Sequence, residues 1–378
     1  MSKVQEQGHV DWLILLPVAG LLMFSVAFVY SASSTFAEAK LGSSEQLFWN
    51  HAIRVLLGIV LMIGVSRIHY RFWERSSAVG VLISIGFLLL VLLMGTEIKG
   101  ASRWIKLGPI NFQPSELAKY ALVLHVAVLL SARRALIRDW RKSLVPVMAW
   151  TLPICVLIAL QPNMSTATVI FTIVLSMLFL ADVRPLHLIT IMGASALVGG
   201  LYAVSAEYRL KRLMTFFGMD GADPAVAYQL DQALIAFGNG GILGVGPGQS
   251  RQRDWFLPES HSDFIFSIVG EEYGFLGVSL LVGCFVLIVW RGFGIARKAP
   301  DSFGRLLAGG ITTTLGLYAF VNAGVTCGLL PTTGLPMPFI SYGGTSVFFS
   351  AIAVGILLNI SSHSGVYGKK RTQIDEPS

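Results

Sequence analysis

The stretch from Trp255 to Gly277 carries acidic side chains at the edge of an apolar segment and inside it. It begins as a polar turn and continues as an apolar run, with Asp263 at the junction and Glu271 and Glu272 within the run. A carboxylate in a membrane-spanning segment is energetically costly, and by default it marks a functional site. These three acids are therefore the first candidates for chemistry.

Helix geometry separates the three acids from one another. At about 100° per residue Glu271 shares the face of Asp263 but lies about 12 Å deeper, whereas Glu272 points nearly the opposite way. A partly buried carboxylate beside a cation can act as a general base, and it can also bind a divalent cation through oxygen. We expect Asp263 to do chemistry, and we expect Glu271 and Glu272 to pin helices together through buried pairs.

Two neighbouring motifs are poor matches to zinc or nucleotide sites. Residues 259–263, Glu-Ser-His-Ser-Asp, include His261 and two acids, but their spacing matches no common zinc pattern. The glycine-rich run at 238–248 follows no strand and precedes no Gly-Lys-Ser/Thr, so it is no phosphate loop. We expect a flexible loop whose backbone closely approaches lipid or substrate.

Basic residues gather on the side of the membrane where Asp263 is expected. Arg103 precedes the fourth expected span, and Glu116 and Lys119 stand three residues apart in its first turns. The others are Arg54, Lys99, Lys106, Arg209, Lys211, Arg212, Arg251 and Arg253. Cations around an acid suit an anionic head group such as a diphosphate. A simple ion pair between Glu116 and Lys119, and contacts of the arginines with lipid phosphates, are the alternatives.

The composition indicates what holds these residues in place. Of 378 residues, 54% are hydrophobic and 13% are charged, whereas an ordinary soluble chain is about 25% charged. We predict an all-α integral membrane protein, with residues 1–378 as a single polytopic domain. Its ten predicted transmembrane helices are 12–32, 47–65, 77–95, 115–131, 144–160, 165–181, 186–204, 263–290, 304–327 and 342–360.

A long outer loop at 205–262 and a flexible cytoplasmic tail at 361–378 complete the expected domain. Within the loop, Asp223 and Pro224 are a good helix start, and apolar residues follow at helical spacing. This pattern predicts a short amphipathic helix between spans 7 and 8, which lies on the outer membrane surface or packs within the loop.

The net charge of +7 comes largely from short loops, so it is better explained by membrane orientation than by nucleic-acid binding. Arginines and lysines cluster at 66–76, 132–143, 291–305 and 369–371, all on the side of the N-terminus in a ten-span topology. The positive-inside rule makes that side cytoplasmic, with both termini on it. Asp263 then faces the outside.

The approach to the last span, from Leu329 to Ser346, is interrupted by three prolines and three glycines. Non-helical backbone at membrane depth is tolerated where it is buried in protein or lines a cavity. We therefore expect a re-entrant or kinked segment beside the site, which makes Ser341, Gly343 and Gly344 secondary site candidates.

Three motifs together resemble the shape, elongation, division and sporulation (SEDS) family of bacterial proteins. They are KGASRWI…FQPSELAK at 99–119, the glycine-rich loop leading into FLPESHSDFIFSIVGEE at 238–272, and PFISYGGTS at 338–346. The resemblance covers nearly the whole chain in order. The sequences that begin at Gln232, Ser250, Val269 and Leu330 are closer to the family's division type than to its elongation type.

The resemblance implies a peptidoglycan glycosyltransferase that polymerises lipid II on the outer face of the bacterial cytoplasmic (inner) membrane. It also implies partnership with a class B penicillin-binding protein, which is a transpeptidase, and with other membrane proteins of the divisome. Asp263 matches the family's essential aspartate, and Arg103, Glu116 and Lys119 fall on motif positions that line the outer cavity. Arg251 and His261 are further substrate-binding candidates, and Arg54 is a secondary one.

One departure from the family pattern concerns the loop before the sixth span. The family often has an acid where this chain has Asn163, in Gln-Pro-Asn-Met-Ser-Thr at 161–166. We leave Asn163 out of the expected site.

The expected reaction is an attack by a sugar 4-hydroxyl of the acceptor lipid II on the anomeric carbon of a growing chain. Asp263 would remove or orient the hydroxyl proton, and undecaprenyl diphosphate would leave. Outer cations would stabilise the diphosphate, together with Mg²⁺ or Mn²⁺, for which Asp263 is a possible ligand; no organic cofactor is expected. A lipid II flippase and a non-catalytic scaffold for a transpeptidase are the alternative functions.

Overall fold

The fold is described from a computed structural model, which covers residues 10–43, 45–98, 101–107, 110–254, 256–258 and 260–371. The membrane helices and the elements between them are α1 (Trp12–Leu41), α2 (Gln46–Ser66), α3 (Phe72–Met94), β1 (Thr96–Ile98), β2 (Ala101–Leu107), β3 (Ile110–Phe112), α4 (Pro114–Ala132), η1 (Arg134–Leu136), η2 (Trp140–Leu144), α5 (Val145–Leu160), α6 (Met164–Leu180), α7 (Pro185–Val204), α8 (Glu207–Phe217), α9 (Pro224–Gly240), α10 (Ile265–Lys298), α11 (Ser302–Thr326) and α12 (Gly344–Arg371).

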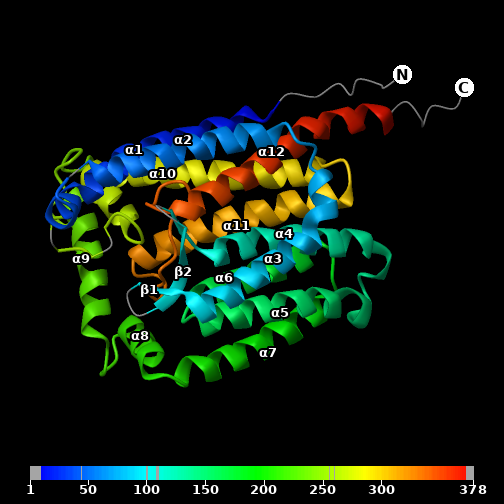
Figure 1. The fold of residues 1–378 in the computed structure, drawn as a ribbon, viewed down its shortest axis with the longest axis horizontal. Helices are drawn as coiled ribbons and strands as arrows, with labels where there is room; N and C mark the ends of the chain where they lie inside the picture. The colour runs from blue at the N-terminus through cyan, green and yellow to red at the C-terminus, as the bar shows by residue number, and fades with distance from the viewer. Residues whose placement is uncertain are drawn as a thin grey trace, which may run out of the picture.

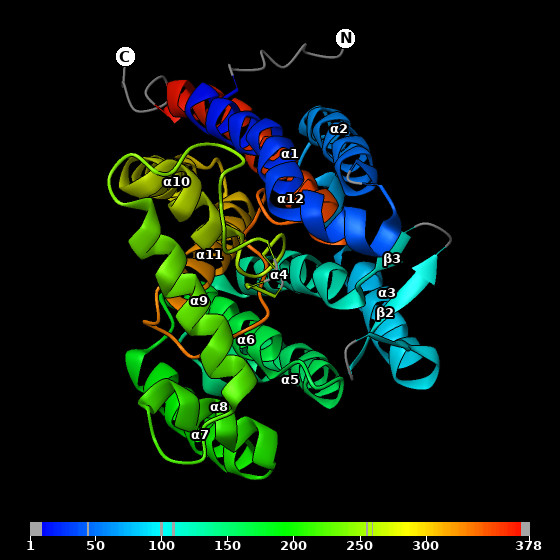
Figure 2. The same cartoon turned by 90° about the vertical axis from the view of Figure 1, so that its left-hand side faces the viewer.

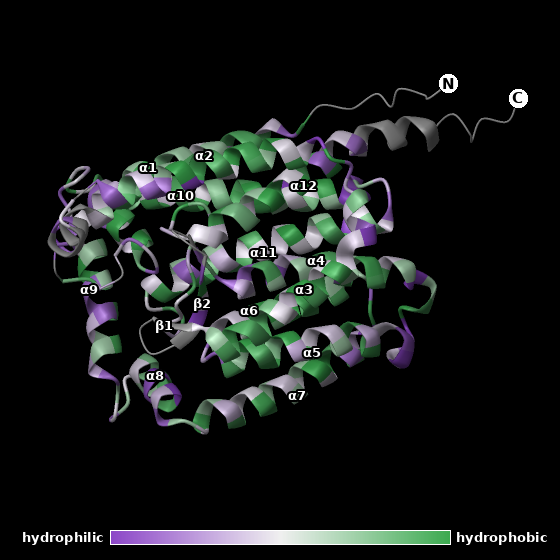
Figure 3. Ribbon diagram, viewed as in Figure 1, coloured by the Kyte–Doolittle hydropathy of each residue, from purple (hydrophilic) through white to green (hydrophobic). Residues whose placement is uncertain are grey.

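Within these described ranges, nine helices are long and apolar enough to cross a membrane. They coincide with nine of the ten predicted spans. The remaining prediction, 165–181, falls on α6, an apolar helix of 17 residues that packs between α5 and α11. Hydrophobic residues dominate the long parallel helices, and hydrophilic residues gather at the two ends of the bundle (Figure 3).

The core of the bundle lies around α11 and α12. In the apolar stretches of these two helices 72% and 78% of the residues are buried, against 6% in α7. α7 contacts only its neighbours α6 and α8 extensively and forms the lower edge of the molecule in Figure 1. α11 and α12 are therefore enclosed largely by protein, whereas α7 presents its sides to the surrounding lipid.

The first and last helices meet at one end of the bundle. The Asp11 backbone N–H donates to the Ser361 hydroxyl over 3.2 Å. Contacts between the basic loops show that they lie at the same end, because Arg71 pairs with Asp301 at 2.7 Å and Arg134 donates to Ser302 at 3.1 Å. This grouping agrees with the predicted one-sided distribution of the cationic loops.

The predicted flexible tail at 361–378 begins too early. α12 continues to Arg371, and Ser361, Ser362 and His363 are buried. Their polarity is compatible with burial because the two serine hydroxyls donate to carbonyls one turn earlier in the same helix. Residues 372–378 lie outside the described part of the chain.

The opposite end carries the polar elements. The purely α prediction missed a small antiparallel sheet, in which β2 pairs with β1 (Ile98 opposite Ala101) and with β3 (Lys106 opposite Asn111). The predicted helix after Asp223 is present as α9, capped by the Asp223 carboxylate on the Ala225 N–H at 3.0 Å. A second loop helix, α8, was not predicted. Figure 2 shows α9 lying across this end of the bundle.

The glycine-rich loop at 238–248 packs on the backbone of α10, and its predicted approach to lipid or substrate stays a prediction. α10 is broken at Gly274, where φ is 62° and ψ is −162°. Val245 and Gly246 donate to the carbonyls of Glu271 and Glu272, each at 3.0 Å. Phe275 and Leu276 in turn donate to Gly241 and Ile242, at 2.9 and 3.2 Å. The loop thus replaces two hydrogen bonds that the break removes from the helix.

Candidate functional site

Asp263 lies immediately before α10, in a loop that is clamped to the polypeptide leading into α12. The side-chain amide of Asn322, on α11, donates to the carbonyls of Asp263 and Leu335, both at 2.8 Å. A Cβ added to Gly334 would lie 3.2 Å from the Asp263 carboxylate, so the acid is in close contact with that loop. Asp263 itself is partly exposed. The carboxylate is therefore both accessible and fixed through its backbone.

The proline-rich segment provides the second half of this clamp. The Ser341 hydroxyl donates to the Ser262 carbonyl at 2.7 Å, and the Tyr342 N–H donates to the His261 carbonyl at 2.9 Å. The segment is non-helical from Pro331 to Pro338, and Phe339 has a φ of 65°, a strained conformation for a bulky residue. The predicted break before the last span is thus present, and it lies against the residues that precede α10.

Tyr342 is the point at which several predicted residues meet. Its ring centroid lies 5.7 Å from those of His51 and His261, and the Arg54 guanidinium lies 5.0 Å from it. Gly344 faces the same guanidinium, since a Cβ there would be 3.9 Å from its central carbon. The structure therefore brings His261, Arg54 and Gly344 together around an aromatic ring that the sequence did not single out. Gly343 lies between Tyr342 and Gly344 along the chain.

Arg103 reaches the site from β2. Its guanidinium donates to the carbonyls of Gln161 and Pro162, the loop that also carries Asn163. Burial and then the positive charge of Arg212 lower the pKa of Arg103, whereas Tyr208 and Asp263 act in the opposite direction. Arginine remains protonated in spite of such shifts. Arg103 is therefore a cation within electrostatic reach of Asp263 and of α8.

Glu116 and Lys119 form a buried ion pair. Their side chains are each 2% exposed and lie 2.9 Å apart. The ammonium group also lies 3.7 Å from the centroid of the Tyr318 ring and 4.8 Å from that of Tyr120. This is the geometry of the structural alternative considered for the pair. Through Tyr318 the pair joins α4 to α11.

Glu271 holds the glycine-rich loop rather than a cation. Its buried carboxylate accepts hydrogen bonds from the Ser250 hydroxyl, from the Gln252 N–H at 3.2 Å and from the Asn239 amide at 3.2 Å. Asn239 lies in the last turn of α9, and Ser250 and Gln252 lie in the segment between α9 and Asp263. Glu271 thus fixes the loop that precedes the site.

Glu272 has different partners, as its opposite direction on the helix requires. It accepts a hydrogen bond from Ser31 on α1, and the Arg253 guanidinium lies 3.8 Å away. Arg253 also donates to the Ser31 carbonyl at 2.7 Å. The predicted substrate cation Arg251 is exposed, whereas Arg253 is only partly exposed and is the cation of this segment that lies beside Glu272.

The donor set around Asp263 is small for a metal site. Within the described residues, no three or more histidine, cysteine, aspartate or glutamate side chains converge. Glu259, the other acid of the motif, lies outside those residues. Magnesium commonly binds through one or two carboxylates together with substrate phosphates and waters. A single carboxylate facing a diphosphate is compatible with that mode of binding.

Three residues important for this geometry were missed from the sequence. Asn322 is a polar residue in an otherwise apolar stretch of α11, which is a detectable signal for an interior contact. Tyr208 comes from α8, a helix that was not predicted, although Arg212 of the same helix was among the predicted basic residues. Tyr342 gave no separate signal, because its role depends on contacts with α2 and with the loop before α10.

Comparison with known proteins agrees with the resemblance found in the motifs. The sequence profile of the family described as "Cell cycle protein", which covers FtsW, RodA and SpoVE, matches residues 11–365. A protein from Geobacter metallireducens, named "Probable peptidoglycan glycosyltransferase FtsW", is 40% identical over 365 residues, which cover 95% of this chain and 96% of the relative. A protein of the same name from Coxiella burnetii is 38% identical and covers 95% and 99%.

Solved structures have the same fold. One similar chain belongs to a peptidoglycan synthase complex studied for the structural coordination of polymerization and crosslinking. Its TM-score is 0.78 at 29% identity, covering 94% of this chain and 98% of that chain. The rod shape determining protein RodA of Thermus thermophilus gives a TM-score of 0.69 at 29% identity, covering 93% and 96%.

Proposed function

This chain belongs to the cell cycle protein family of FtsW, RodA and SpoVE, and from that premise we propose how its site works. It is a peptidoglycan glycosyltransferase of the division type, and its substrate is lipid II. Asp263 is its general base, and the reaction takes place on the outer face of the cytoplasmic membrane. The names of the FtsW relatives support the activity, and the geometry around Asp263 supports the residue.

The single observation that carries the assignment of Asp263 is its combination of accessibility and fixation. Asp263 is partly exposed, whereas Glu116, Glu271 and Glu272 are buried. Its backbone is fixed by Asn322. A general base must be within hydrogen-bond reach of the proton that it removes, so a fixed and accessible carboxylate suits the role.

In the proposed reaction, the 4-hydroxyl oxygen of the acceptor forms a bond to the anomeric carbon of the growing chain. Asp263 takes the hydroxyl proton as the bond between that carbon and the diphosphate oxygen breaks. The diphosphate leaves with the bonding electron pair. Arg103, which is within electrostatic reach of both Asp263 and Arg212, provides positive charge together with Arg212, and such charge stabilises a departing anion.

A bound Mg²⁺ or Mn²⁺ would be held by Asp263 and by the oxygens of the diphosphate, and would neutralise part of the charge that develops there. Water would complete the coordination of such an ion, since within the described residues no group of three or more histidine, cysteine, aspartate or glutamate side chains converges.

We also propose that α6 crosses the membrane, which makes ten spans. Its 17 apolar residues lie within the common range for a span, and the meeting of α1 and α12 at one end requires an even number of crossings. The grouped basic loops at that end favour a cytoplasmic location for both termini. Asp263 then faces the outside, where lipid II is polymerised.

The partner that we propose is a transpeptidase of the class B penicillin-binding type. The similar chain in the solved synthase complex was studied for coordination of polymerization and crosslinking, and this supports an assembly of the two activities.

Polymer formation from purified lipid II in detergent tests the function, because no transport is possible there. We expect glycan strands when the chain is purified with its transpeptidase partner, and we expect EDTA to reduce their formation. If a folded complex formed no polymer, the proposed glycosyltransferase activity would be wrong, and the flippase and scaffold functions would remain. If the Asp263→Ala variant restored growth to cells that lack the gene for this protein, the scaffold function would be favoured.

A further inference from the structure

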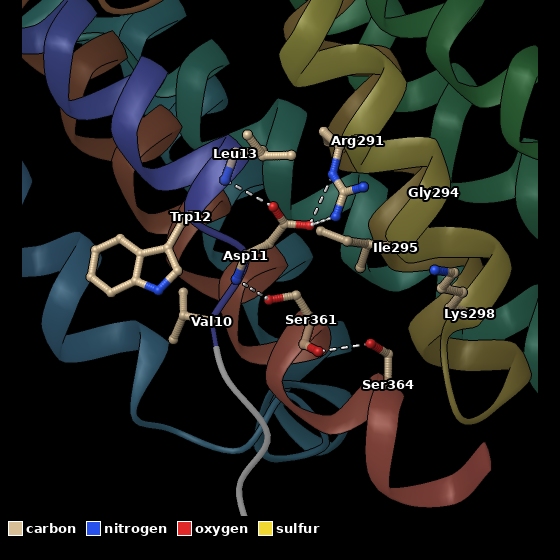
Figure 4. Close-up of a pocket in the computed structure, with 10 residues that line it drawn as sticks. All are labelled: Val10, Asp11, Trp12, Leu13, Arg291, Gly294, Ile295, Lys298, Ser361 and Ser364. Carbon is tan, nitrogen blue, oxygen red and sulfur yellow. Dashed lines mark hydrogen bonds and ion pairs between the residues drawn. The ribbon is translucent and has the colours of Figure 1, made fainter. Parts of the chain in front are cut away.

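A polar cavity of about 410 Å³ lies at the opposite end of the molecule from Asp263. It is formed by the start of α1, the last turns of α10 and the cytoplasmic part of α12 (Figure 4). Its polar lining consists of Asp11, Arg291, Lys298, Ser361 and Ser364, with Trp12 at the side. None of these residues belongs to the site described above.

The Asp11 carboxylate is already satisfied by the protein. It caps α1 by accepting from the Leu13 N–H at 3.0 Å, and it accepts from Nε and Nη2 of Arg291 at 3.1 and 2.5 Å. Figure 4 shows the carboxylate between the Leu13 backbone and the guanidinium. The Nη1 group of Arg291 is not used by Asp11, so it is available to a ligand.

The charge of the cavity is positive. Lys298, two turns after Arg291 on α10, is exposed and forms no ion pair with a carboxylate in the part of the chain that the structure describes. The two cations and the one carboxylate leave a single positive charge. A phosphodiester carries one negative charge, so the cavity is matched in both charge and donor type to such a group.

Tryptophans place the cavity at the depth of lipid head groups. Trp12 is 59% exposed and Trp290 is 62% exposed, and the Arg291 guanidinium lies 5.7 Å from the Trp290 ring. Exposed tryptophans of membrane proteins gather at the interface between hydrocarbon and water. Leu16 and Val286, exposed one turn deeper on α1 and α10, offer an apolar surface for acyl chains. A soluble anion would not contact that apolar surface, whereas the acyl chains of a lipid would.

We propose that this cavity binds the head group of an anionic phospholipid with a phosphodiester, such as phosphatidylglycerol. Lys298 and Nη1 of Arg291 contact the phosphate, and the acyl chains lie along α1 and α10. Basic pockets between membrane helices are suited to such head groups. The lipid joins the three helices that line the cavity, and this role is independent of the chemistry at Asp263.

Native mass spectrometry of the purified chain tests the proposal. The protein is equilibrated with equal amounts of phosphatidylglycerol and phosphatidylethanolamine in detergent, and the retained lipids are counted. We expect preferential retention of phosphatidylglycerol. Lys298→Ala should reduce that preference about fivefold, the effect of roughly one basic residue near an anionic lipid. Lys298 is exposed, so the variant is expected to fold.

Arg297→Ala is the matched control, since Arg297 is the preceding residue, equally basic and exposed, and does not line the cavity. It should retain the preference of the original chain. The proposal would be wrong if both variants lost the preference for phosphatidylglycerol to the same extent, or if the original chain showed no such preference. A third arm adds inorganic phosphate: displacement of the lipid by phosphate alone at low concentration would assign the cavity to a soluble anion instead.

Discussion

Two acidic regions lie eight residues apart at the start of α10, and the protein uses them in opposite ways. Asp263 stands before the helix and is partly exposed, and its backbone is held by an amide from α11. Glu271 is buried within the helix, and its carboxylate accepts three hydrogen bonds, two from the preceding loop and one from the end of α9. In one case the protein holds the backbone and leaves the side chain accessible. In the other it occupies the side chain itself.

The contrast shows why the identity of an acid in a membrane segment does not define its role. A buried carboxylate costs free energy unless hydrogen bonds satisfy it, and a carboxylate buried among structural donors is not presented to a substrate. In the sequence, the different depths of Asp263 and Glu271 along the helix distinguished their roles. In the structure, their hydrogen-bond partners distinguish them. Four substitutions test this division between a reactive region and a structural one.

Replacing Asp263 should have the largest effect on activity. Asp263→Asn keeps the size of the side chain but removes its basicity, so polymerisation by the complex should fall by roughly 10³-fold, within the range for a lost general base. The thermal midpoint in detergent should not change. Asp231→Asn, which alters an exposed acid on α9, is the control. Retained activity in Asp263→Asn would remove this residue from the chemistry.

Replacing Glu271 should affect stability first. Glu271→Ala leaves the Ser250 hydroxyl, the Gln252 N–H and the Asn239 amide without their acceptor, so the free energy of unfolding should fall by about 3 kcal/mol. A lower thermal midpoint measures this loss. Glu45→Ala, at an exposed position, should leave the midpoint unchanged. If Glu271→Ala is fully stable but inactive, the assignment of Glu271 as structural is wrong.

Asn322 links the two loops of the site, so its replacement should misplace Asp263 without unfolding the bundle. Asn322→Asp keeps the shape but removes both N–H donors, and kcat should fall by about 10²-fold with a smaller change in KM. Thr326→Ala, one turn further along α11, removes a hydroxyl that bonds only its own helix and should be active. Equal activity of the two variants would show that the clamp is dispensable.

Arg103 should give the smallest of the four effects. Arg103→Lys keeps the positive charge but loses the forked contact with the carbonyls of Gln161 and Pro162, so KM for lipid II should rise by about tenfold while kcat changes little. Lys106→Ala, on the same strand but exposed, is the control. A change in kcat alone would mean that Arg103 acts on the transition state rather than on binding.

Much of the architecture could be predicted because long apolar runs define membrane helices. The capping pair Asp223 and Pro224 located α9, and arginine-rich loops identified the end shared by the termini. The sheet at 96–112 was missed because its strands are only three to seven residues long. The Gly108-Pro109 pair between two of them was an available turn signal.

The site was predictable as far as single residues carry their own signal. Asp263 stood out by polarity, but its clamp did not, because Asn322 lies 59 residues away along the chain and acts on a backbone carbonyl. Such side-chain to backbone contacts leave little pattern in one sequence. Glu116 and Lys119 gave a correct spacing, yet only the structure reveals that the tyrosine rings of two helices enclose the pair.

The break in α10 at Gly274 has a consequence for biogenesis. The carbonyls of Glu271 and Glu272 and the N–H groups of Phe275 and Leu276 find partners only in the loop at 241–246, which leaves the ribosome before the helix does. Unpaired backbone groups are costly in hydrocarbon. The first part of this helix, from Ile265 to Gly274, therefore cannot reach its final depth as an independent unit. Its insertion is completed only when the loop at 241–246 folds onto it and supplies these hydrogen bonds.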